Sequence, residues 1–164
     1  SKKYMNKDDC LFCSIVKGEV PSHTVWSDEN HLAFLSIFPN TEGFTVVIPK
    51  DHHDSYAFDQ TDQVLQDLIL ATKKVAKILD HHFKDVARCG MFFEGFGVDH
   101  LHSKLFPMHG TGDLEAWKNI ESESNKQFFK TYPGYLSSND SDRADDKQLA
   151  KLAKELRQSS QEVL

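Results

Sequence analysis

The segment "DHLHSKLFPM", residues 99–108, alternates polar and apolar side chains. Side chains two residues apart lie on the same face of a β-strand, so we expect His100, His102 and Lys104 on one face. Lysine is rarely buried without a partner, so this face is not predicted to lie in the core. The spacing alone leaves two interpretations open: an anion-binding, catalytic face, or an exposed sheet face without a special role.

The surrounding sequence predicts a sheet. Short runs rich in β-branched and aromatic residues, bounded by turn-forming residues, are typical of strands. Such runs occupy residues 23–26, 31–38, 44–49, 89–94 and 100–106. The links between the first three runs are too short for helical crossovers, so those strands are predicted to pair antiparallel. The fold class expected is α+β, with a meander sheet of about five antiparallel strands.

Two helices accompany the predicted strands. Apolar residues recur at steps of three and four from Thr61 to Phe83, which indicates one long helix capped by Asp59 or Thr61. A short amphipathic C-terminal helix is predicted from a second apolar set: Leu149, Leu152, Ala153 and Leu156. We expect residues 1–164 to form a single domain with its core at about 10–110 and a C-terminal extension over 111–164.

Composition excludes several functional classes. A net charge of −6 and a pI near 5.8 argue against duplex nucleic acid as a partner, because phosphate binding usually requires a basic patch. The sequence has no apolar run long enough to span a membrane and no secretory signal pattern. The odd, small number of cysteines, 3, does not suggest a disulfide scaffold. We expect a cytoplasmic protein.

Cys10 and Cys13 have the two-residue spacing that lets both thiolates bind one tetrahedral zinc ion. By itself the pair supplies only half of a site. Two ordinary thiols are the alternative, and a thioredoxin-like redox motif is disfavoured because no βαβ pattern surrounds the pair.

The segment "HLHSKLFP" resembles the motif of the histidine triad (HIT) family, His-φ-His-φ-His-φ-φ with φ apolar, often followed by proline. Upstream, "CLFCSIVKGEVPSHTVWSDENHLAFLSIFPNTEGFTVVIPKDHH" is similar to the N-terminal half of the family, so the resemblance covers Cys10 to His109. Lys104 replaces the third histidine, which marks a divergent, bacterial-type member. The resemblance implies a five-stranded antiparallel sheet with a long helix, and a homodimer.

The resemblance also implies a reaction. The middle histidine, here His102, attacks the α-phosphate of a dinucleoside polyphosphate or nucleoside phosphoramidate and forms a covalent nucleotidyl-histidine, which water or another acceptor cleaves. His100 would support this step. Lysine is a reluctant proton donor at neutral pH, so we expect Lys104 to hold phosphate charge and to keep His102 neutral by lowering its pKa. The rival hypothesis is a module that binds a nucleotide or another small phosphate ligand with little or no turnover.

Other positions depart from the family pattern. Ser36 stands where many members have an aspartate for the ribose hydroxyls, Phe93 replaces an asparagine, and Phe96 replaces a glutamine. These residues and Lys104 are the candidate substrate contacts. For Phe93 and Phe96 we weigh stacking on a base against filling of the core or pocket wall, and favour filling.

The family resemblance also bears on the cysteine pair. Many bacterial relatives complete a zinc site with the histidine of the Ile-Pro-Lys-x-His corner, here His52, and with a histidine near the triad, here His100. His53 is an alternative to His52. The predicted zinc ligands are therefore Cys10, Cys13, His52 and His100.

Overall fold

The computed structural model describes residues 9–112, 120, 127–137 and 142–163. The chain divides into two compact units, residues 1–117 and 118–164. The single-domain assignment with an extension from residue 111 stays a prediction.

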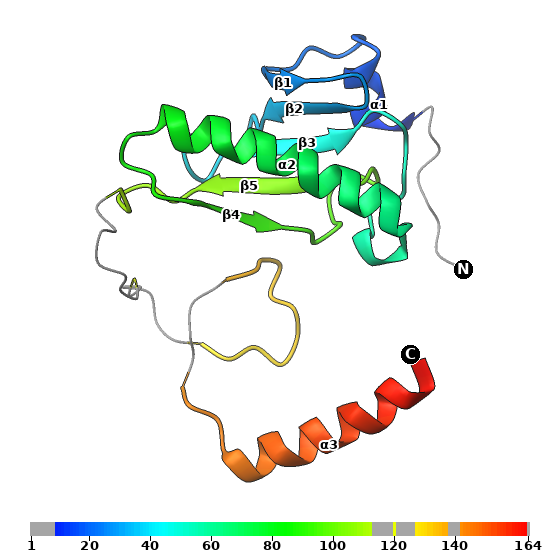
Figure 1. Cartoon of the computed structure of the whole chain (residues 1–164), viewed down its shortest axis with the longest axis vertical. Helices are drawn as coiled ribbons and strands as arrows, with labels where there is room; N and C mark the ends of the chain where they lie inside the picture. Colours follow the sequence, from blue (N-terminus) through cyan, green and yellow to red (C-terminus); the bar gives the residue numbers. More distant parts are fainter. Residues whose placement is uncertain (1–8, 113–119, 121–126, 138–141, 164) are drawn as a thin grey trace. The chain divides into compact units, whose positions relative to one another are not determined.

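The first unit is built on one open sheet (Figure 1). Its strands are β1 (Thr24–Ser27), β2 (His31–Leu35), β3 (Thr45–Pro49), β4 (Cys89–Phe92) and β5 (Ser103–Pro107). Their order across the sheet is β1-β2-β3-β5-β4, and every neighbouring pair is antiparallel. The predicted α+β class and five-stranded antiparallel sheet are confirmed.

The sheet differs from a simple meander in its last two strands, because β5 rather than β4 pairs with β3. The connection from β3 to β4 contains the long helix α2 (Asp62–His82). A helical crossover returns the chain parallel to the strand that it left. β4 therefore takes the edge position, and β5, which runs opposite to both strands, fits between them.

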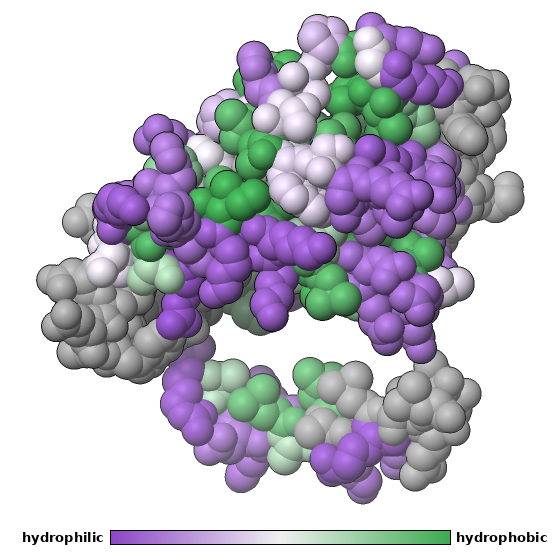
Figure 2. Space-filling model, turned by 45° about the horizontal axis from the view of Figure 1, so that its top comes forward, coloured by the Kyte–Doolittle hydropathy of each residue, from purple (hydrophilic) through white to green (hydrophobic). Residues whose placement is uncertain are grey.

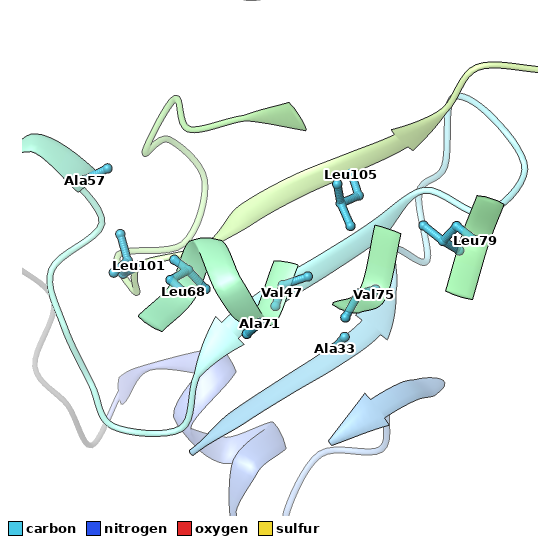
Figure 3. Packing of buried hydrophobic residues seen from close by; sticks show 9 residues of the cluster. All are labelled: Ala33, Val47, Ala57, Leu68, Ala71, Val75, Leu79, Leu101 and Leu105. Carbon is cyan, nitrogen blue, oxygen red and sulfur yellow. The ribbon is translucent and has the colours of Figure 1, made fainter. Parts of the chain in front are cut away.

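Helix α2 covers one face of the sheet. It begins after Thr61, whose hydroxyl accepts a hydrogen bond from the Val64 N–H at 3.2 Å, so Thr61 rather than Asp59 is the cap. Figure 3 shows the buried residues that lie between the helix and the sheet: Leu68, Ala71, Val75 and Leu79 on α2, and Ala33, Val47 and Leu105 on the strands. The predicted apolar stripe is the buried face of this helix.

A buried pair of hydroxyl groups joins α2 to β5. The Thr72 hydroxyl donates to the Leu68 carbonyl within α2 at 2.7 Å, and it lies 2.8 Å from the Ser103 hydroxyl. Since the Thr72 proton is already used, Ser103 must be the donor of the second bond.

The opposite face of the sheet carries a second apolar cluster. Alternate residues of β2 and β3 point to this face, and the short helix α1 (Leu11–Val16) packs on them. The cluster contains Cys10, Phe12, Cys13, Leu32, Phe34, Val46 and Ile48. The sequence pattern did not reveal α1, because 6 residues are too few to show a helical period.

The turn after β5 is fixed by a small polar network. The His109 Nε2–H donates to the Glu42 carbonyl at 2.8 Å, and Nδ1 lies 3.1 Å from the Asp85 carboxylate. The Glu42 carbonyl and then Asp85 raise the pKa of His109. The Gly110 N–H and then His109 lower the pKa of Asp85.

The second unit contains helix α3 (Asp146–Val163), which confirms the predicted C-terminal helix. Hydrophobic and hydrophilic residues both reach its surface (Figure 2), and Leu149 and Leu152 are exposed. None of the helices in the described ranges is both long and apolar enough to cross a membrane.

Candidate active site and metal centre

The strand that carries the histidine motif begins later than predicted. β5 starts at Ser103, so His100 and His102 lie in the irregular segment before it and not in the expected strand 100–106. The ladder between β3 and β5 ends at the pair Val47 and Ser103. Upstream of that pair, the Leu101 N–H donates to the His53 carbonyl at 2.8 Å and the backbone leaves the sheet.

The predicted alternation is nevertheless kept: the His100 and His102 rings both contact Phe12, at centroid distances of 5.8 Å and 5.3 Å, while Leu101 and Leu105 pack on the opposite side, under α2. His102 and Lys104 line the same pocket, whereas the His100 imidazole lies between the two cysteines and the end of β3. Alternation therefore gives the side on which each of these side chains lies, but it does not show which of them line the pocket.

The His100 imidazole is completely buried in a fixed orientation. Its Nε2–H donates to the Pro49 carbonyl at 2.8 Å, which leaves Nδ1 with the lone pair. Nδ1 lies 3.4 Å from the Cys10 Sγ and 3.5 Å from the Cys13 Sγ. Burial lowers the pKa of His100 to about 4, so the ring is neutral. A hydrogen bond from the second ring nitrogen to a carbonyl is the usual arrangement of a metal-binding histidine.

Four side chains meet at this point. The Cys13 Sγ also lies 3.3 Å from the His52 Nδ1, and the four potential ligand atoms of Cys10, Cys13, His52 and His100 are all within 4.8 Å of one another. Zinc–sulfur bonds of about 2.3 Å and zinc–nitrogen bonds of about 2.0 Å place neighbouring ligand atoms of a tetrahedron about 3.3–3.8 Å apart. The separations and the Cys₂His₂ donor set fit a tetrahedral zinc ion.

The short helix α1 explains why both thiols reach this point. Cys10 is the N-cap of α1, and its Sγ accepts a hydrogen bond from the Cys13 N–H at 3.4 Å. His52, not the alternative His53, contributes its ring to the cluster.

A pocket of about 400 Å³ lies on the sheet face that α1 covers. Its lining residues are Leu11, Phe12, Ile15, Val20, Pro21, Ser22, Phe34, Leu35, Ser36, Ile37, Phe38, Phe44, Val46, Phe96, Gly97, Val98, His102 and Lys104. The candidate substrate contacts Ser36, Phe96 and Lys104 are therefore part of one pocket with His102.

Phe93 is the candidate that the pocket does not include. Its side chain packs against the cluster between α2 and the sheet. The adjacent Phe92 contacts Phe106 with a ring-centroid separation of 5.4 Å. Phe93 therefore fills the core, which is the role that the sequence analysis favoured for it.

His102 has one ring nitrogen available for chemistry. Its Nδ1–H donates to the His100 carbonyl at 2.6 Å, so Nε2 carries the lone pair. The Phe12 ring meets the imidazole edge to face at a centroid distance of 5.3 Å and restrains it. Burial is the main cause of the lowered pKa of His102, and the positive charge of Lys104 acts in the same direction, while the His100 carbonyl and Glu94 oppose it. The direction expected from Lys104 is thus correct, but desolvation is the larger cause.

Lys104 has a partner that the sequence analysis missed. Its Nζ forms an ion pair with the Glu94 carboxylate, and both side chains are largely buried, at 22% and 19% exposed. The β4–β5 register pairs Phe92 with Lys104, which brings the residue two positions after Phe92 near the lysine. The register between β4 and β5 would have predicted the contact between Glu94 and Lys104, but the sequence alone does not determine this register.

The end of the pocket that holds His102 and Lys104 is consequently close to neutral. Among the described residues that line it, Lys104 is the sole lysine or arginine, and Glu94 offsets its charge. The arrangement combines a neutral, oriented imidazole with one paired cation.

Comparison with known proteins identifies the family of this chain. Residues 17–111 match the model of the HIT domain. The protein named Protein hit of Bacillus subtilis is 34% identical over 110 residues, which cover 65% of this chain and 75% of the relative. Adenosine 5′-monophosphoramidase of Saccharomyces cerevisiae is 31% identical over 119 residues, which cover 71% of this chain and 75% of the relative.

A solved structure is similar in fold. The crystal structure of a Streptococcus mutans protein superposes with a TM-score of 0.66 at 29% identity and covers 97% of this chain and 91% of that protein. The chain belongs to the HIT domain family.

Proposed function

We propose that the protein is a nucleotide phosphohydrolase that acts at the α-phosphate through a covalent intermediate on His102, with nucleoside phosphoramidates as its preferred substrates. The observation that carries this proposal is the orientation of His102 in the pocket. Its Nδ1–H is held by the His100 carbonyl, so the lone pair lies on the opposite nitrogen, Nε2.

The reaction has two steps. In the first, Nε2 attacks the α-phosphorus, the phosphorus–nitrogen bond of the substrate breaks, and the amine leaves with a proton from solvent. In the second, water attacks the same phosphorus, the bond to Nε2 breaks, and the nucleoside monophosphate is released. A nucleotidyltransferase would use another acceptor in place of water.

Charge favours a phosphoramidate over a dinucleoside polyphosphate. A polyphosphate chain brings several negative charges, which a binding site usually matches with several cations or a metal. Lys104 is one cation, and it is already paired with Glu94. A phosphoramidate has a single phosphoryl group and an amine leaving group, so its binding requires fewer cations. The similarity to a yeast protein named adenosine 5′-monophosphoramidase agrees with this choice.

The test is turnover of adenosine 5′-phosphoramidate and of a dinucleoside polyphosphate by purified protein beside the His102→Ala variant. We expect release of adenosine monophosphate from the phosphoramidate, faster than cleavage of the polyphosphate, and loss of both activities in His102→Ala. Equal product formation by the variant would refute the role of His102. Supplying inorganic phosphate or a sugar phosphate and identifying the products separates a hydrolase from a transferase.

The second candidate function is a nucleotide-binding module with little turnover. The Glu94–Lys104 pair favours it, because Glu94 offsets the one positive charge that lines the described pocket next to His102. Tight binding of nucleotide by the wild-type protein and by His102→Ala, without product from either, would support this alternative.

We further propose that Cys10, Cys13, His52 and His100 hold a structural zinc ion. A bound zinc ion would fix α1 against the His100 segment, whose carbonyl orients His102. Elemental analysis is expected to give one zinc per chain, and Cys13→Ser to lose it together with thermal stability. A metal-free wild-type protein that unfolds at the same temperature with and without added zinc would exclude the site.

A homodimer and a cytoplasmic location complete the proposal. β4 lies at the edge of the sheet, and its outer side pairs with no other strand in the described part of the chain, so it is available to a second copy. Light scattering of the purified protein is the test. Cys10, Cys13 and Cys89, all in the described ranges, form no disulfide there, which suits a reducing compartment.

A further inference from the structure

We infer that the pocket selects its substrate by a planar apolar group and does not recognise the two hydroxyl groups of a ribose, so that sugar-modified nucleotides and simple aryl phosphoramidates are ligands of the same site. This inference rests on the proposed function for the position of the phosphate. The inference adds the chemical class of the group that is attached to this phosphate.

The walls of the pocket carry the argument. Apart from His102 and Lys104 at the phosphate end, the polar side chains among the described lining residues are those of Ser22 and Ser36. Within the described part of the chain, no carboxylate or amide side chain lines the pocket. Phenylalanine, leucine, isoleucine and valine side chains make up most of the surface.

Both serines already have local hydrogen-bond partners. The Ser36 hydroxyl accepts from the Phe38 N–H at 3.1 Å, and the Ser22 hydroxyl lies 3.4 Å from that of Thr24. A ribose diol placed against these walls would exchange its water for few protein partners, and such an exchange is unfavourable. A flat apolar group would instead lose unfavourable contact with water.

The rim of the pocket offers aromatic surface for such a group. Phe96 is 65% exposed and Phe38 is 85% exposed, so both rings present uncovered faces or edges at the entrance. Hydrophobic residues reach the surface at several places on this unit (Figure 2). A bound ring that covers part of Phe96 would remove apolar area from water, which stabilises the complex.

The experiment measures binding of three products to the wild-type protein by calorimetry: adenosine monophosphate, its 2′,3′-dideoxy analogue, and phenyl phosphate. The dissociation constants of the two nucleotides are expected to agree within about threefold, and phenyl phosphate is expected to compete with both. A site that hydrogen-bonds a substrate hydroxyl rejects the analogue lacking it by far more than tenfold. A tenfold or larger loss for the dideoxy analogue, or no competition by phenyl phosphate, would overturn the inference.

Two matched variants locate the planar group. Phe96→Ala is expected to weaken all three ligands by about fivefold or more, since stacking of a base on an aromatic ring is a substantial contribution. Phe58→Ala removes a ring that is 77% exposed but is not among the residues that line the pocket. It is expected to leave the dissociation constants of all three ligands unchanged. Equal effects of the two variants would contradict the inference. Because the ligands are products, the result does not depend on turnover, so a failure of the proposed reaction would be seen separately.

Discussion

Replacing Glu94 by glutamine removes the carboxylate that pairs with Lys104 and raises the charge at the phosphate end of the pocket by one unit. If the paired, neutral state of this end disfavours polyphosphates, Glu94→Gln shifts specificity toward them. The relevant quantity is the ratio of kcat/KM for a dinucleoside tetraphosphate to kcat/KM for adenosine 5′-phosphoramidate.

The size of the shift follows from Coulomb's law. Residues two apart in an extended chain lie about 7 Å apart, which estimates the distance from the Lys104 charge to a phosphate at His102. At an effective dielectric constant between about 20 and about 80, one charge at that distance contributes about 2.4 to about 0.6 kcal/mol. The ratio is therefore expected to rise by between about threefold and about fiftyfold for each additional negative charge on the substrate.

The control is Glu29→Gln, which makes the same change of charge in the exposed turn between β1 and β2. It is expected to leave the ratio unchanged, and added salt is expected to reduce the effect of Glu94→Gln because the pocket is open to solvent. A ratio that stays within twofold of the wild-type value, or falls, would refute the electrostatic account of substrate choice.

Three further predictions concern the fold. Thr72→Val leaves the buried Ser103 hydroxyl without its acceptor, so it is expected to lower the free energy of unfolding by about 1–3 kcal/mol. Ser103→Ala is expected to lower it by only about 1 kcal/mol, and the double variant is expected to be more stable than Thr72→Val alone. Urea denaturation measures this order, and additive effects of the two substitutions would contradict it. The raised pKa of His109 and the lowered pKa of Asp85 make their contact stabilising between about pH 4 and pH 6.5, and the contribution is lost as the pH rises through the pKa of His109 or falls through that of Asp85. The Tm difference between wild type and His109→Gln is therefore expected to be larger at pH 6 than at pH 9, and equal differences would exclude the effect. Burial raises the pKa of the Cys89 thiol to about 12, so at pH 8 iodoacetamide is expected to modify Cys89 at least tenfold more slowly in the folded protein than in urea; equal rates would show that the thiol is not protected.

Local pattern was sufficient for most of the fold. The period of the long helix located α2 within one residue at each end, because a stripe of that length has no competing interpretation. The strand order was harder to predict. Placing β5 between β3 and β4 depends on the helical crossover and on pairing between distant segments, which periodicity does not describe.

The composition of the site and part of its geometry were predicted. Cys10, Cys13, His52 and His100 meet as the family resemblance implied. The strand alternation correctly placed His100 and His102 on one side, but it did not show that only His102 lines the pocket with Lys104. The start of the strand was also predicted too early, because residues 100–102 precede the β3–β5 ladder and the Leu101 N–H bonds to the His53 carbonyl instead. The contact between Glu94 and Lys104 was not predicted, because it depends on the register between β4 and β5.

The central claim is that His102 forms a covalent nucleotidyl intermediate. The most direct measurement is mass spectrometry of protein quenched in acid-free conditions during turnover of adenosine 5′-phosphoramidate, with peptide mapping of the adduct. The account predicts an adenylyl group on His102 that disappears when substrate is exhausted and never forms in His102→Ala. Steady turnover without an adduct, or an adduct on another residue, would contradict it.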